Sequence, residues 1–127
     1  RHKHRRFGGG YDPKENVVNK GAIQFLAQAT YSGPLLTGPL SLRVVAYLAR
    51  PKNHYRTGKN AGQLKANFAA TSPTKTPDAD NLAKLIMDAL TKVVWGDDKQ
   101  ITRLEVEKLW ADERPETTVE IGAIGGA

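Results

Sequence analysis

The strongest constraint on the fold is a run of apolar residues between positions 82 and 93 that recurs with the period of an α-helix. These residues occupy positions i, i+3, i+4, i+7, i+8 and i+11, and they are Leu82, Leu85, Ile86, Ala89, Leu90 and Val93. On a helix drawn through this run, Asp80, Lys84 and Asp88 lie on the opposite side. Gly96 follows, where a helix commonly ends. The sequence therefore predicts an amphipathic helix with one buried face and one charged face.

Three other segments alternate between apolar and polar residues, which is typical of half-buried β-strands. They are residues 40–48, 100–110 and 117–124. In the second segment, the charged Lys108 shares a face with the apolar Val106 and Trp110. In the last segment, we expect Val119 and Ile121 to face inward.

An earlier helix is predicted to begin at Asp12, which can cap it, with Pro13 in the first helical position and Glu15 completing a capping box. Its expected buried face is apolar at helical spacing. The residues of that face are Val18, Ala22, Phe25, Leu26 and Ala29. The turn at residues 31–34 is expected to end this helix.

Two segments lack a regular period and are rich in basic residues. Residues 1–10 are interpreted as an exposed basic arm. Residues 50–77 are predicted to form a long flexible basic loop with one helical turn around residues 64–68. We predict that these segments contact phosphate groups, although a loop that is charged only for solubility is the alternative. The predicted DNA contacts are Arg1, Lys3, Arg5, Arg6, Arg50, Lys52, Arg56, Lys59 and Lys65. His54 or Tyr55 is a candidate for stacking on an unpaired base.

The charge of the chain is divided between its two halves. Residues 1–66 contain 12 Lys and Arg against two acidic residues, a net charge of +10, and residues 67–127 contain 7 against 11, a net charge of −4. The overall charge of +6 fits a generic nucleic-acid binder, but such a binder does not need an acidic half. The absence of cysteine excludes disulfides, thiolate metal sites and cysteine nucleophiles. No apolar run approaches the roughly 20 residues that cross a bilayer, so we expect no membrane partner.

Acidic residues bracket the helix predicted over residues 82–93. Asp78 and Asp80 precede it, and Asp97 and Asp98 follow it. Each of them alone can serve as a helix cap or a turn residue. Asp78, Asp80 and Asp98 can converge if the strand after the turn pairs beside the strand before the helix. Three carboxylates without His or Cys form a hard oxygen site, which suits Mg²⁺ or Mn²⁺ rather than zinc.

Such an ion meets the needs of phosphodiester hydrolysis. It holds phosphate oxygens, lowers the pKa of an attacking water and stabilises the leaving oxygen. Lys84 lies one turn from Asp80 on the same helix face and can orient that water or neutralise charge in the transition state. The basic half of the chain then holds a phosphate backbone beside an acidic site that would otherwise repel it.

The residues around this helix also resemble the pattern of a known family. The pattern consists of D-x-D-N-L-x-K at residues 78–84, D-A-L at 88–90 and D-D-x-Q-I at 97–101. In this order and spacing it resembles the RusA family of Holliday junction resolvases. A looser similarity extends to the basic residues near Arg5 and to the final predicted strand.

The resemblance implies a fold and an activity. The fold is a single α+β domain over residues 1–127, with a small mixed β-sheet packed by two main helices, and it forms a homodimer. The family's basic N-terminal motif follows a strand, which we expect to be missing from a chain that begins at Arg1. The activity is Mg²⁺-dependent cleavage of four-way DNA junctions by paired symmetric nicks, without a small-molecule cofactor, in the cytoplasm of a bacterial or phage-infected cell.

The resemblance also implies the site residues. Asp78, Asp80 and Asp98 match the family's metal-binding catalytic carboxylates, and Lys84 matches its essential lysine. Asp97 is a further candidate ligand, and Mn²⁺ is a candidate substitute for Mg²⁺. Two alternatives stay open. One is a basic nucleic-acid-binding module without catalysis, whose carboxylates only cap and turn. The other is a Mg²⁺ nuclease that acts on flap or RNA substrates.

Overall fold

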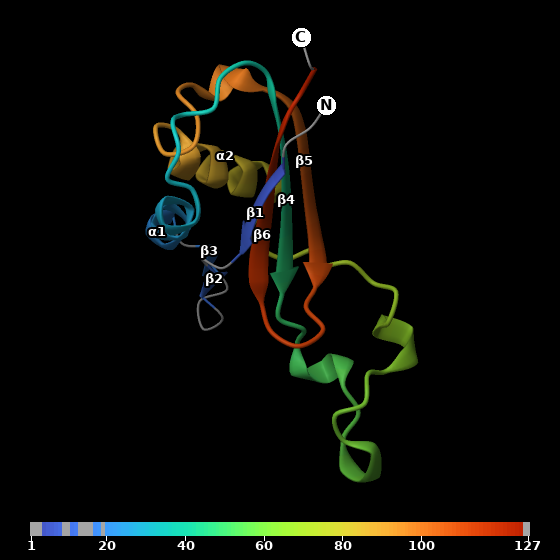
Figure 1. Cartoon of the computed structure of the whole chain (residues 1–127). Coiled ribbons are helices and arrows are strands. Elements are labelled where there is room, and N and C mark those ends of the chain that lie inside the picture. The colour runs from blue at the N-terminus through green and yellow to red at the C-terminus, as the bar shows by residue number, and fades with distance from the viewer. Residues whose placement is uncertain (1–3, 9–10, 13–16, 19, 126–127) are drawn as a thin grey trace.

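The computed structural model describes residues 4–8, 11–12, 17–18 and 20–125. Within them, four strands form a mixed sheet in the order β1-β6-β4-β5 (Figure 1). The central β4 (Leu40–Leu48) is antiparallel to β6 (Glu116–Ala123) and parallel to β5 (Ile101–Trp110). β1 (His4–Gly8) pairs antiparallel with the other edge of β6. The strands predicted over residues 40–48, 100–110 and 117–124 are thereby confirmed.

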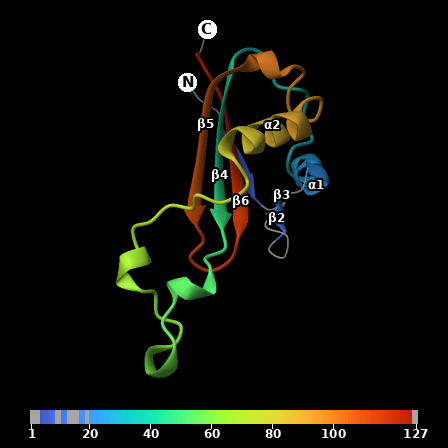
Figure 2. The ribbon, with the colours of Figure 1, turned by 180° about the vertical axis from the view of Figure 1, so that it is seen from behind.

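Two helices cover one face of this sheet, α1 (Lys20–Thr30) and α2 (Ala79–Leu90), and both views show them on the same side (Figures 1 and 2). The core lies between the helices and the sheet, where Ile23, Leu42 and Ile86 are at most 1% exposed. We call the sheet face that the helices leave uncovered the open face. This arrangement confirms the predicted α+β class with two main helices. No helix in the described residues combines the length and apolar character that crossing a bilayer requires.

The periodic elements follow their sequence patterns closely. In β4, every second residue from Leu40 to Leu48 is at most 1% exposed and faces the helices. α2 buries Leu82, Ile86 and Leu90 as predicted but ends at Leu90, before Val93. It ends there because the backbone of Thr91 is extended, with φ of −63° and ψ of 131°, and Lys92 follows in a left-handed conformation with φ of 69°.

Residues 4–8 correct the prediction of an exposed N-terminal arm. They form β1, whose register places Arg6 opposite Glu120 and Phe7 opposite Val119. The strand forms because its backbone groups pair with the otherwise open edge of β6. This pairing depends on a partner more than 100 positions away in the sequence, so residues 4–8 carry no local period that announces it.

The first helix is shorter than predicted and buries a different face. β2 (Tyr11–Asp12) and β3 (Val17–Val18) pair as a short antiparallel ladder, which replaces the helix expected from Asp12. The helix α1 buries Ile23 and Ala27, one turn apart, whereas Phe25 is 70% exposed. The prediction placed Phe25 on the buried face, and that assignment is wrong.

Residues 49–77, which we call the extension, leave the C-terminal end of β4 and project away from the sheet before they return to α2 (Figure 1). As predicted, the extension contains no long regular element. Its described elements are the 3₁₀ helices η1 (Lys52–His54), η2 (Gly58–Asn60) and η3 (Ala66–Phe68), and a bridge between Tyr55 and Leu64. The helical turn predicted around residues 64–68 corresponds to η3.

Candidate active site

The N-terminus of α2 presents three of the predicted site residues to solvent. Asp78 occupies the N-cap position, yet its carboxylate makes no capping hydrogen bond. Asp80 lies in the first turn and Lys84 one turn later, and all three side chains are exposed. The opposite face of the helix, which includes Leu82 and Ile86, is buried against the sheet and fixes the orientation of the charged face. The fold therefore holds two carboxylates on a regular element without capping the helix with them.

Lys108 of β5 holds the segment that leads into α2. Its Nζ atom donates hydrogen bonds to the carbonyl oxygens of Lys75 (2.7 Å) and Pro77 (3.0 Å). Lys108 lies on the same face of β5 as Val106 and Trp110, as the sequence predicts. Because Asp78 follows Pro77 directly, these bonds tie its backbone to the C-terminal half of β5.

The second pair of acidic residues lies in the turn before β5, at the start of η4 (Asp98–Gln100). The carboxylate Oδ1 of Asp97 accepts a hydrogen bond of 2.9 Å from the backbone N–H of Lys99. This bond, followed by the positive charge of Lys99, lowers the pKa of the Asp97 carboxyl. Asp97 therefore has the capping role that the structural alternative predicted for the acidic turn, while Asp98 is exposed and caps nothing.

The side chain of Gln100 fixes this acidic turn. Its Oε1 atom accepts hydrogen bonds from the backbone N–H groups of Gly96 and Asp97, both at 3.1 Å. Its Nε2 atom donates to the carbonyl oxygens of Leu36 (2.9 Å) and Gly38 (3.1 Å). One amide thus links the turn to the segment that enters β4.

The two groups of carboxylates lie far apart in one chain. Pro77 lies beside Lys108, toward the C-terminal end of β5, whereas Asp98 precedes the first residue of that strand. The strand between Ile101 and Lys108 spans about 23 Å at a rise of about 3.3 Å per residue. An Mg²⁺ ion needs oxygen ligands at about 2.1 Å, so one ion cannot bind both groups in this arrangement.

The expectation that Asp78, Asp80 and Asp98 converge within one chain is therefore wrong. Among the described residues, no three acidic or histidine side chains are grouped so that they could hold a metal ion. The physical reason is the parallel pairing of β4 and β5, which places the start of β5 at the opposite end of the sheet from the point where the extension departs. An open hollow of about 420 Å³ instead brings Asp98 together with Asp88 and Lys20.

The predicted phosphate contacts differ in how the structure presents them. Outside the described part of the chain lie Arg1, Lys3 and the side chains of Arg5 and Arg6. Exposed along the extension are Lys52, Arg56 and Lys59. Half-buried at the base of the extension are Arg50 and Lys65. The last two take part in packing, so a phosphate contact is not their only role.

His54 is not free to stack on a DNA base, contrary to one of the predictions. It is buried, and its ring lies parallel to that of Phe68 at 4.1 Å and edge-on to that of Trp110 at 5.0 Å. The Nη1 atom of Arg50 lies 3.1 Å from Nδ1 of His54 and donates to the carbonyl oxygen of Phe68 at 3.0 Å. Because a guanidinium only donates, Nδ1 of His54 must accept and carries no proton. Tyr55 is half-buried and stays a candidate.

Comparison with known proteins decides the family. Residues 1–122 match the family model described as endodeoxyribonuclease RusA. The chain belongs to the RusA family. This membership confirms the resemblance of the pattern at residues 78–101 and implies an endonuclease, which is a hydrolase. The uncharacterized protein YqaN of Bacillus subtilis (strain 168) is 31% identical over 102 residues, which cover 80% of this chain and 70% of that relative.

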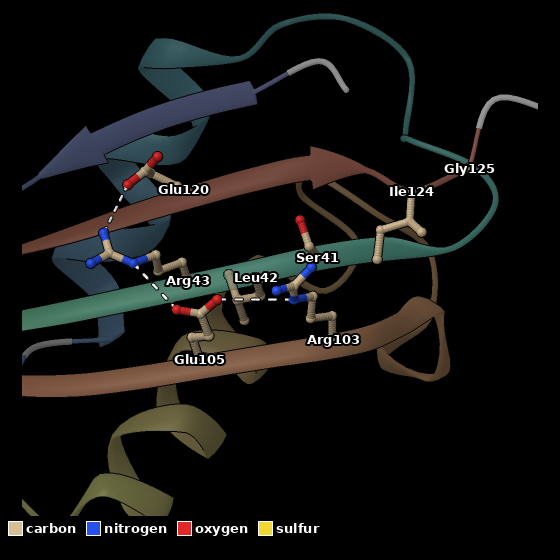
Figure 3. A pocket seen from close by; sticks show the side chains of 8 residues that line it. All are labelled: Ser41, Leu42, Arg43, Arg103, Glu105, Glu120, Ile124 and Gly125. Carbon is tan, nitrogen blue, oxygen red and sulfur yellow. Dashed lines mark hydrogen bonds and ion pairs between the residues drawn. The ribbon is translucent and has the colours of Figure 1, made fainter. Parts of the chain in front are cut away.

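The open face of this RusA-family chain carries a different group of carboxylates. Arg43 lies 3.1 Å from Glu120 and 3.5 Å from both Glu105 and Glu107, and Figure 3 shows it between Glu105 and Glu120. Arg43, Glu105 and Glu120 line a hollow of about 460 Å³ together with Arg103. Because Arg43 is shared among the three carboxylates, their charges are already partly compensated. The exposed acids at α2 are therefore better candidates for a metal site.

Two residues that organise the RusA-family site, Lys108 and Gln100, have no role predicted from the sequence. Lys108 was visible as a charge on an apolar strand face, which is a signal for a buried polar partner. Gln100 was visible only as a member of the family pattern, because its four backbone partners come from two separate segments. Such partners depend on tertiary structure and have no local sequence signature.

Proposed function

We propose that this protein is a Mg²⁺-dependent, structure-selective endodeoxyribonuclease that resolves four-way DNA junctions as a homodimer. The observation that carries the proposal is the exposed pair Asp78 and Asp80, held at the N-terminus of α2 without a capping role. Membership of the RusA family supports hydrolysis of DNA. The basic residues of the extension supply the attraction that a polyanionic substrate needs beside an acidic site.

The donor set fits a hard divalent cation, because its candidate ligands are carboxylate oxygens. Asp78 and Asp80 would hold Mg²⁺, or Mn²⁺ in its place, and Asp98 would be the third ligand. When bound, the ion supplies Lewis-acid stabilisation of the phosphate and an activated water. Lys84 lies one turn from Asp80 on the same exposed face, so its ammonium can neutralise the charge that develops on the phosphate.

A homodimer accounts for the distance between Asp98 and the other two carboxylates. In a two-fold dimer, the N-terminus of α2 in one subunit can meet the turn before β5 in the other. Asp98 of the partner subunit would then complete each site. The symmetry produces two equal sites, and a four-way junction offers two equivalent strands for cleavage.

The first experiment maps the products of a labelled four-way junction incubated with the protein, with and without Mg²⁺. We expect two symmetric nicks that require the metal. Asp80→Asn should abolish nicking and retain junction binding, because a ligand is lost while repulsion of phosphate falls. The matched control is Asp112→Asn, an exposed acid in the turn after β5, which should leave nicking unchanged. Nicking by Asp80→Asn at nearly the wild-type rate contradicts the assigned site.

The second experiment tests whether each site is shared between subunits. A mixture of Asp80→Asn and Asp98→Asn chains, each inactive alone, should regain activity if the site is shared. One of the two sites in each mixed dimer then contains only wild-type ligands, so a single nick is expected. If each site were built within one chain, the mixed dimer would have no intact site and would stay inactive.

The same assays separate the alternative functions. Competition among junction, flap, duplex and RNA identifies a nuclease with a different substrate. A binding module without catalysis would bind DNA equally with and without Mg²⁺. It would also tolerate simultaneous substitution of Asp78, Asp80 and Asp98, and it would release no cleaved product from any of these substrates.

A further inference from the structure

We propose that the base of the extension is a phosphate-binding site for the DNA backbone, formed by Arg50, Lys65, Lys75 and Lys108. We call these four residues the base cations. The proposal rests on the proposed function, because it states where the DNA substrate is held. Arg50 and Lys65 are among the DNA contacts predicted from the sequence, whereas Lys75 and Lys108 are not, and the comparisons with known proteins assign no such role to either of them.

The base cations belong to one connected set of contacts. The Nζ atom of Lys75 donates to the carbonyl oxygen of Ala49 at 3.0 Å, which joins the two ends of the extension. Lys108 in turn donates to the carbonyl oxygen of Lys75. Lys75 and Arg50 both lie over the ring of Trp110, at 5.3 and 5.7 Å from its centroid. Three positive charges therefore meet where the extension leaves the sheet.

Aromatic rings connect the fourth cation to the other three. The Nζ atom of Lys65 lies 6.0 Å from the ring centroid of Phe68. Phe68 stacks on His54, which contacts the edge of Trp110. The Nε1 atom of Trp110 also donates to Oγ1 of Thr71 at 3.1 Å. These contacts restrict the positions of the cations, so less freedom is lost when an anion binds.

None of the base cations forms an ion pair with a carboxylate within the described part of the chain. The ion pairs formed there involve Arg43 and Arg103, on the open face of the sheet. Burial, followed by the charges of three of the base cations, lowers the pKa of His54, which agrees with a positive potential at the base. A group of half-buried cations without such an ion pair attracts an anion, and the polyanionic substrate supplies one.

The base cations also have hydrogen-bond donors left for a ligand. An ammonium has three N–H donors, of which Lys108 uses two and Lys75 one in the bonds described above. Arg50 engages its Nη1 atom and keeps donors on its other nitrogen atoms. All four side chains are half-buried, so they are fixed by packing and still reach solvent.

The position of the cluster relates it to the candidate active site. Lys108 binds the carbonyl oxygen of Pro77, and Asp78 is the next residue. A DNA strand held at the base therefore passes close to the carboxylates of Asp78 and Asp80. The base cations would keep the strand beside an acidic pair that repels it.

The test measures junction binding without cleavage, by fluorescence anisotropy of a labelled four-way junction in Ca²⁺ at several salt concentrations. The variants of the full chain are Lys65→Gln, Lys75→Gln and the double substitution. We expect each change to weaken binding on the order of tenfold near 0.1 M salt. The slope of log K against log salt should fall by about one for each cation removed. Arg103→Gln removes the same charge from the open face and should change binding less than about twofold.

Two results would overturn the inference. One is wild-type affinity and salt slope in the double variant, and the other is an equal loss of binding in Arg103→Gln. In the described structure, the ammonium of Lys65 makes no hydrogen bond to the backbone. Lys65→Gln therefore still tests the inference even if Lys75→Gln has a lower melting temperature than the wild type. Lys75→Arg keeps the charge and should bind like the wild type. Failure of the proposed function looks different, because the wild-type protein then fails to bind the junction or binds it without ever nicking it in Mg²⁺.

Discussion

The amide of Gln100 provides a direct test of how the acidic turn is held. In Gln100→Ala, four backbone groups lose their partner. The N–H of Gly96 and the carbonyl of Leu36 are partly buried. Leaving each of them without a partner should lower the free energy of unfolding by about 1 kcal/mol. The N–H of Asp97 and the carbonyl of Gly38 are exposed and can bind water instead.

The same substitution removes the capping box on η4, which should lower the free energy of unfolding by a further amount of about 0.5–1 kcal/mol. We therefore expect the free energy of unfolding to fall by about 3 kcal/mol. For a domain of this size, that lowers the melting temperature by about 10 °C. Calorimetry and urea denaturation measure both quantities. The control is Gln28→Ala on the exposed face of α1, which should change the free energy by less than about 0.5 kcal/mol. If both variants melt together with the wild type, the four bonds do not stabilise the turn.

Gln100→Glu separates the donor bonds from the acceptor bonds. The new carboxylate can still accept from Gly96 and Asp97, but it faces the carbonyl oxygens of Leu36 and Gly38 without a proton. Its pKa should therefore be raised in the folded state. A raised pKa means that the folded state binds the proton more tightly, so the loss of stability at pH 7 should shrink as the pH falls toward 5. A loss that grows toward low pH contradicts the assignment of these bonds.

Three further changes test other parts of the structure. Ile86→Ala empties a fully buried site in the core and should lower the free energy of unfolding by about 3–4 kcal/mol in urea denaturation, whereas a loss below 1 kcal/mol contradicts the packing. The pKa of His54 is lowered by burial and then by nearby cations, so the unfolded chain binds this proton more readily. The melting temperature should therefore fall as the pH drops below about 6.5, and His54→Gln should remove that part of the dependence. Arg43→Met leaves three carboxylates together on the open face and should cost about 1 kcal/mol at low salt, a difference that should shrink in 1 M NaCl.

Elements with a strong local period could be predicted from the sequence, and elements defined by distant pairing could not. The alternation through β4 and the helical spacing from Leu82 to Leu90 describe one buried face each, so the pattern alone fixed their type and orientation. β1 had no such pattern, because its place depends on the edge of β6. α1 was misjudged because a cap signal at Asp12 competed with a short ladder that uses the same residues.

The exposure of the candidate residues on α2 could be predicted from the sequence, and their position relative to Asp98 could not. The pattern from Asp78 to Lys84 identified exposed groups on one helix end, because that spacing is local. The distance to Asp98 depends on whether two strands pair in parallel, which no single segment of sequence specifies. The role of His54 was missed for a related reason, since the rings and the guanidinium that enclose it come from different parts of the chain.

The open face and the extension carry opposite net charge. The described charged side chains of the open face are Glu105, Glu107, Glu116 and Glu120, against Arg43 and Arg103. The base cations and the extension form a basic side elsewhere, at and beyond the C-terminal end of β4. A nucleic acid that approaches the open face is repelled, and one that approaches the basic side is attracted, so the protein is turned before any contact forms. Encounters between the protein and DNA are thereby biased toward a single orientation. Raising the salt concentration should therefore reduce the rate of association with DNA more than it changes the rate of the cleavage step.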